Sequence, residues 1–102
     1  MFKKLFGSKS NYKFKEQKDT ACFTCNHILD DKQEILYVSH DNDSSWQFLC
    51  GNNNHSEEDA RIVSIEQITK IDTTVNYLYE MPNGICAERK NKGDKWKPYK
   101  LQ

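Results

Sequence analysis

ILYVSHDNDSSWQFLC, residues 35–50, sets the architecture of this chain. Two runs of strand-forming residues, Ile35–Ser39 and Trp46–Cys50, flank a short cluster of His, Asp, Asn and Ser, and this pattern predicts a β-hairpin. Because side chains alternate along a strand, every second residue of the second run should share one face: Trp46, Phe48 and Cys50. The aromatic neighbour on that face places Trp46 in the core rather than on a contact surface.

Further strand-like runs lie at residues 21–24, 61–63, 85–89 and 96–101. Ser64 and Gln67 have the spacing of a capping box, which predicts a helix start. The apolar residues that follow recur at the spacing of one helical face: Ile65, Ile68, Ile71, Val75 and Leu78. Asp72 can act as a second N-cap and divide this segment into two short helices. The predicted fold is therefore α+β, with an antiparallel sheet of about four to six strands packed by one or two short helices at 64–80.

A chain of 102 residues predicts one domain. Residues 1–18 carry six lysines against Glu16, and we expect a basic N-terminal lead-in of the kind that frays, followed by a single α+β domain at 19–102. Charge is uneven although the total is zero: net +5 at 1–18, −7 at 19–70 and +2 at 71–102. An acidic middle segment favours a basic partner.

The sequence predicts a cytoplasmic protein. Lysines interrupt the start of the chain where a secretory signal would be apolar, and no apolar run is long enough to span a bilayer. Four cysteines in such a chain are typical of thiols or metal ligands rather than disulfides.

The sharpest chemical pattern is a Cys-x-x-Cys pair. Thiolate and imidazole are the ligands that Zn²⁺ prefers, and a two-residue spacer can bring both sulfurs to one ion. The later candidates have no second pair of this kind. We expect no cofactor, and keep as an alternative a small structural or regulatory zinc module with these ligands: Cys22, Cys25, Cys50 and His55, or His27 in place of His55.

No catalytic constellation is evident, so we expect no enzyme and no small-molecule substrate. The three histidines lie in polar or turn contexts, which are typical of solvated side chains. Lysines at 95, 97 and 100 alternate with Trp96 and Tyr99, a pattern that nucleic-acid binders use. The same alternation is typical of an edge strand protected by lysine, and nucleic acid is not the partner we expect.

One set of motifs resembles a known family. It comprises Asp43–Gly51, Ile62–Ile65, Asp72, Met81-Pro82-x-Gly84, Ala87–Arg89 and Trp96, within roughly residues 20–97. In this set the chain is similar to the thirty-third immunity-protein family of bacterial polymorphic toxin systems, a family of domains of unknown function. Ser45 stands where the family pattern has Gly, and Thr73 where it has Pro.

The resemblance implies a non-catalytic protein that neutralises a toxin by binding and occluding it. The acidic middle of the chain fits a basic toxin such as a nuclease, because opposite charge speeds association. The expected contact residues lie on the loops that flank the hairpin: Asp41, Asp43, Glu57, Glu58 and Asp59.

Overall fold

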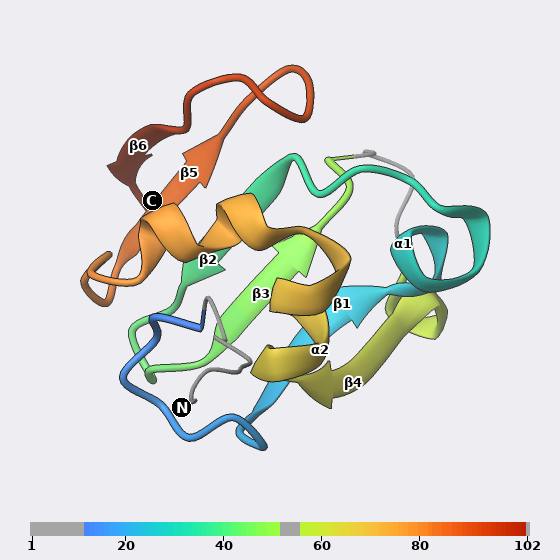
Figure 1. Ribbon diagram of the computed structural model, residues 1–102, viewed down its shortest axis with the longest axis horizontal. Coiled ribbons are helices and arrows are strands. Elements are labelled where there is room, and N and C mark those ends of the chain that lie inside the picture. Colours follow the sequence, from blue (N-terminus) through green and yellow to red (C-terminus); the bar gives the residue numbers. More distant parts are fainter. Residues whose placement is uncertain (1–11, 52–55, 102) are drawn as a thin grey trace, which may run out of the picture.

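A computed structural model describes residues 12–51 and 56–101 (Figure 1). With η for a 3-10 helix, the elements in chain order are β1 (Ala21–Cys25), α1 (Asn26–Asp31), β2 (Tyr37–His40), β3 (Trp46–Leu49), η1 (Glu57–Asp59), β4 (Ala60–Ser64), α2 (Ile65–Ile71), η2 (Thr73–Leu78), β5 (Ile85–Glu88) and β6 (Lys97–Lys100). The predicted α+β class and the predicted hairpin, which is β2–β3, are both confirmed.

The six strands form one sheet in the order β4-β1-β3-β2-β5-β6. Neighbouring strands are antiparallel except β1 and β3, which pair in parallel through Phe23 and Gln47. The predicted sheet is antiparallel, so this one parallel pair is a correction to a sheet whose other pairs are antiparallel. Its physical basis is the long connection from β1 to β3, which contains α1 and β2 and gives the chain room to return in the same direction.

The helical segment begins and divides where the capping residues predict. Ser64 Oγ accepts a hydrogen bond from the Gln67 amide at 3.1 Å, and α2 begins at the next residue. Asp72 ends α2 and caps η2 by accepting from the Thr74 amide at 2.9 Å. The predicted stripe is buried except at Ile71, which is 39% exposed because the chain changes direction at Asp72.

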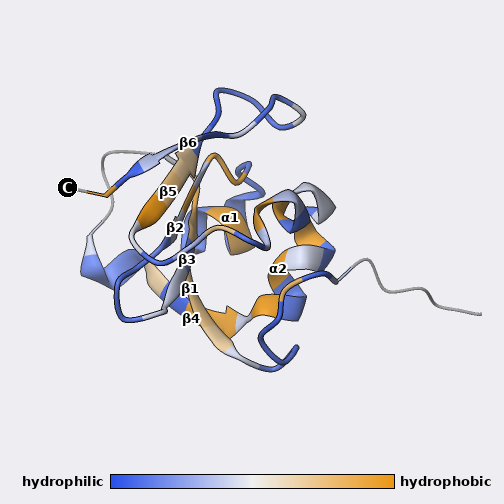
Figure 2. Cartoon of the chain, turned by 90° about the vertical axis from the view of Figure 1, so that its left-hand side faces the viewer, coloured by the Kyte–Doolittle hydropathy of each residue, from blue (hydrophilic) through white to orange (hydrophobic). Residues whose placement is uncertain are grey.

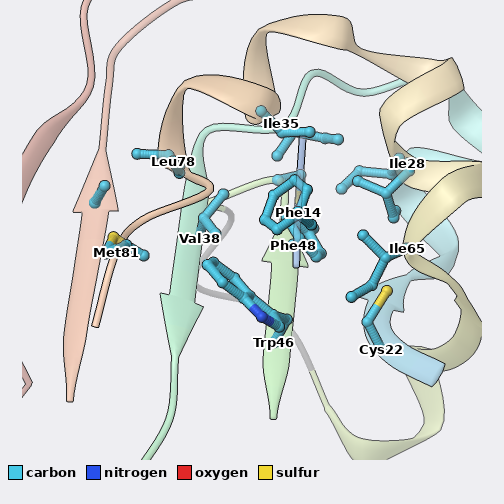
Figure 3. Packing of buried hydrophobic residues seen from close by; sticks show 14 of the residues in the cluster. Phe14, Cys22, Ile28, Ile35, Val38, Trp46, Phe48, Ile65, Leu78 and Met81 are labelled. Atoms are coloured by element: carbon cyan, nitrogen blue, oxygen red, sulfur yellow. The ribbon is translucent and has the colours of Figure 1, made fainter. Parts of the chain in front are cut away.

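The core lies between the sheet and the helices, and α1 and α2 are on the same side of the sheet (Figure 2). Trp46 and Phe48 point from β3 into this layer, where their rings stack on each other with centroids 5.8 Å apart (Figure 3). The prediction that Trp46 belongs to the core is confirmed, since only 2% of it is exposed.

The described part of the expected lead-in, residues 12–18, packs on this core. Phe14 is buried with its ring edge-on to Trp46, at 4.9 Å between centroids. The Lys13 amide donates to Asn76 Oδ1 on η2, and the Trp46 indole N–H donates to Glu16 Oε2 at 2.9 Å. The segment therefore covers one side of the hairpin.

His40 is buried as well, whereas the sequence indicated a solvated side chain. Its ring stacks on Trp46 with centroids 3.9 Å apart, and its Nδ1 lies 2.6 Å from the Met81 carbonyl oxygen. The polar residues that follow His40 in the sequence gave no sign that the Met81 carbonyl lies beside its ring.

Within residues 12–51 and 56–101, no helix has the length and apolar character needed to cross a membrane.

Candidate functional site

The face of the sheet opposite α1 and α2 carries an exposed apolar pair. Strand register places Phe23 on β1 beside Ile62 on the edge strand β4, and beside Gln47 on β3. Phe23 is 40% exposed and Ile62 is 67% exposed. Side chains alternate along β1, so Cys22 and Thr24 are buried beneath the helices while Phe23 faces away from them. We call Phe23 and Ile62 the apolar pair.

The β2–β3 turn brings two of the expected contact residues to one end of this face. Asp41 Oδ2 accepts a hydrogen bond at 2.7 Å from Nε2 of Gln47, the neighbour of Phe23 across the strands. Asp43 Oδ1 accepts from the Ser45 amide at 3.0 Å, and hydrogen bonding by Ser45 lowers the pKa of this exposed carboxyl. Both carboxylates therefore also shape the turn.

The other three expected residues form η1, immediately before β4. Glu57 and Glu58 are exposed, and the Asp59 side chain closes a capping box by accepting from the Ser56 amide at 3.1 Å. Because β4 begins beside Cys25 and ends beside Ala21, η1 is at the opposite end of the strands from the β2–β3 turn. The five acidic residues thus form two groups, one at each end of the strands that carry the apolar pair.

The structure brings together a different metal-ligand set from the one that the sequence favoured. The Sγ atoms of Cys25 and Cys50 and a ring nitrogen of His27 all lie within 4.8 Å of one another. Cys22, on the same strand as Cys25, is outside this group, and its side chain lies near Ile65 in the core (Figure 3). Burial raises the pKa of the Cys22 thiol to about 12. His55 lies outside the described residues.

Three positions of the family-like pattern meet in a buried ionic network. Arg89 Nη2 donates to Asp72 Oδ2 at 2.6 Å, and the guanidinium lies over the Trp96 ring at 4.0 Å from its centroid. Arg89 also donates to Thr74 Oγ1 and twice to the Ile35 carbonyl oxygen. Burial acts to raise the pKa of Asp72, but hydrogen bonds from Thr74 and Arg89 and the charge of Arg89 outweigh it, and the pKa is lowered.

This network is a structural feature rather than a reaction site. The Arg89 and Asp72 side chains are 0% and 3% exposed, so neither can contact a substrate in this conformation. Their hydrogen bonds connect the start of η2 to the residue that follows β5 and to the chain just before β2. The spacing of Asp72, Arg89 and Trp96 in the sequence gave no sign of this meeting, since the three lie on separate elements.

The comparison with protein families gives one result that covers most of the chain. The Immunity protein Imm33 domain matches residues 22–100. No match was found among curated proteins or among solved structures. The family match spans β1 to β6, including the apolar pair, both acidic groups and the Arg89 network. This chain therefore belongs to the family of immunity proteins defined by the Imm33 domain.

Proposed function

We propose that this protein is an immunity-type inhibitor that binds a bacterial protein toxin and occludes its active surface. Membership of an immunity family supports a protective role and a protein partner, and it favours a non-catalytic protein. The single observation that locates the proposed toxin-binding surface is the apolar pair, which is exposed on the face of the sheet opposite α1 and α2.

The chemistry of this face fits a protein partner. Stable interfaces have an apolar centre surrounded by a polar rim, and residues in such centres carry most of the binding energy. Phe23 and Ile62 supply the centre, while Asp41 and Gln47 supply hydrogen-bonding groups beside it. Ile62 also lies on an edge strand, where unpaired backbone groups can bond to another chain.

The acidic groups at the two ends of the strands favour a basic toxin. Glu57, Glu58 and Asp59 follow one another directly, so their negative charges add over a small area. Opposite charge on the partner would speed the encounter, and the apolar pair would then hold the complex. A toxin that acts on nucleic acid has such a basic surface.

Growth protection tests the proposal. A candidate toxin, chosen from the genes that neighbour the gene of this protein, is expressed together with wild type or with the Phe23→Glu/Ile62→Glu variant. We expect wild type to restore growth and the variant to fail, because two buried carboxylates would weaken binding by on the order of 100-fold. Since both side chains are exposed in the unbound protein, its melting temperature should change little.

Tyr77→Ser is the matched control. Tyr77 is 79% exposed but lies on η2, on the helical side of the sheet, so this variant should protect as wild type does. If the Tyr77 variant lost protection while the variant of the apolar pair retained it, the assigned face would be wrong. If wild type bound no toxin encoded beside it, the proposed function itself would fail.

Charge reversal at η1 tests whether the acidic residues there speed association with the toxin by long-range attraction. For Glu57→Lys/Glu58→Lys, we expect the association rate with a basic toxin to fall about tenfold at low salt, with a smaller change at high salt, because salt screens exposed charges. Stopped-flow or surface-based kinetics at two ionic strengths measure this. Lys92→Glu, an exposed reversal in the β5–β6 connection, is the control. An unchanged rate for the η1 variant would remove these acids from the interface.

A further inference from the structure

We propose that Cys25, His27 and Cys50 form a binding site for a soft transition-metal ion, with Zn²⁺ as the natural occupant. The inference does not depend on the proposed function. The site lies beside η1, because Cys25 pairs with Ala60 on β4 and Asn26 Nδ2 donates to Asp59 Oδ1 at 3.5 Å. It uses three ligands that lie on two segments of the chain, and only one of the two cysteines in the Cys-x-x-Cys pair takes part.

The separations of the donor atoms fit one ion. With Zn–S bonds of about 2.3 Å and Zn–N bonds of about 2.0–2.1 Å in tetrahedral geometry, donor atoms lie roughly 3.5–3.8 Å apart. The three donors here are already within 4.8 Å of one another. Side-chain adjustments of about 1 Å would close the set around a metal, with no change in the strands.

The positions of these ligands are fixed by paired strands and by the first turn of a helix. Cys25 ends β1, a central strand that is paired on both sides, and it is also the N-cap residue of α1. His27 lies in the first turn of that helix, and Cys50 directly follows β3, the parallel neighbour of β1. After Cys50 the chain turns at Gly51, whose φ of +82° suits glycine. Both cysteines are thus fixed by adjacent strands.

The donor chemistry selects the kind of ion. Two thiolates and one imidazole suit Zn²⁺ and disfavour hard ions such as Mg²⁺ or Ca²⁺, which prefer oxygen. Cys25 and Cys50 are 2% and 7% exposed, so an ion there would be shielded from bulk water. Three protein ligands leave the fourth position of a tetrahedral ion for water or for an added ligand.

Metal binding by the full chain tests this inference without any toxin. The purified, reduced protein is stripped with chelator, dialysed and titrated with Zn²⁺ against a chromophoric competitor, and then with Co²⁺. We expect one equivalent of Zn²⁺, and a Co²⁺ spectrum with a sulfur-to-metal charge-transfer band and tetrahedral d–d bands. Saturating Zn²⁺ should also raise the melting temperature, because it binds the folded state.

Single substitutions then locate the ligands. Cys25→Ala, His27→Ala and Cys50→Ala should each weaken binding by at least about 100-fold, whereas Cys22→Ala should bind as wild type does. Circular dichroism of each metal-free variant shows whether it is folded, and His27→Ala, at a half-buried position, disturbs the core least. Retained affinity in His27→Ala, or equal loss in Cys22→Ala, would overturn the ligand set.

One further result would overturn the site itself: less than about a tenth of an equivalent of Zn²⁺ bound by the reduced protein at micromolar free metal.

Discussion

Replacing Arg89 with methionine is expected to lower the free energy of unfolding by about 3–5 kcal/mol. The change removes the cation but leaves Asp72 buried, and a buried carboxylate without its partner is costly. It also removes the two hydrogen bonds to the Ile35 carbonyl oxygen and the contact of the guanidinium with Trp96. Urea denaturation of the two proteins at neutral pH measures the difference.

Two companion variants make this test specific. Lys90→Met removes an exposed cation at the next position and should change stability by no more than about 0.5 kcal/mol. Adding Asp72→Asn to Arg89→Met should recover part of the loss, because no charge is then left buried without a partner. If Arg89→Met were as mild as Lys90→Met, the buried network would not hold η2 to the sheet.

Replacing Phe14 with alanine is expected to cost about 3–5 kcal/mol, as truncation of a buried Phe does. The ring is 5% exposed and contacts Trp46 and Phe48 edge-on, so its loss would leave a cavity over the hairpin. Thermal or urea unfolding followed by tryptophan fluorescence would report it directly, since Trp46 lines that cavity.

Lys15→Ala is the matched control for Phe14. Lys15 is exposed and one residue further along the same segment, so the change should lie within about 0.5 kcal/mol of wild type. A mild effect of Phe14→Ala would mean that residues 12–18 do not cover the core in solution, and that the folded unit begins nearer to residue 19.

Local signals in the sequence predicted much of the fold. The polar cluster between two β-rich runs predicted the β2–β3 hairpin, and alternation predicted which face of β3 is buried. Ser64 and Asp72 predicted the starts of α2 and η2 because capping depends on neighbouring backbone amides. Each of these features is governed by interactions within a few residues.

What the sequence did not reveal depends on contacts between distant segments. Phe14 lies among lysines, and nothing near it shows that Trp46, thirty-two positions later, provides its contact. The parallel pairing of β1 with β3 likewise depends on how the chain returns past α1. Of the candidate zinc ligands, Cys22 lies apart from the group of Cys25, His27 and Cys50, which the Cys-x-x-Cys spacing alone does not show.

The same distinction applies to the proposed toxin-binding face. The acidic residues were visible as a charge pattern, whereas the apolar pair was not, because Phe23 and Ile62 become neighbours only when β1 pairs with β4. A strand residue in a short apolar run is as compatible with the core as with the surface. The positions of α1 and α2, which pack against the other face, leave these two side chains exposed.

The most direct measurement is the amide chemical-shift map of the ¹⁵N-labelled protein as the unlabelled toxin that passes the growth-protection test is added. The proposed function predicts that the largest shifts and line broadening fall on β1 and β4 around Phe23 and Ile62, with smaller changes at Asp41 and η1. Amides of η2 around Tyr77 should stay unperturbed. Perturbation centred on η2, with the β1 and β4 amides unchanged, would contradict the assignment of this face as the proposed toxin-binding surface.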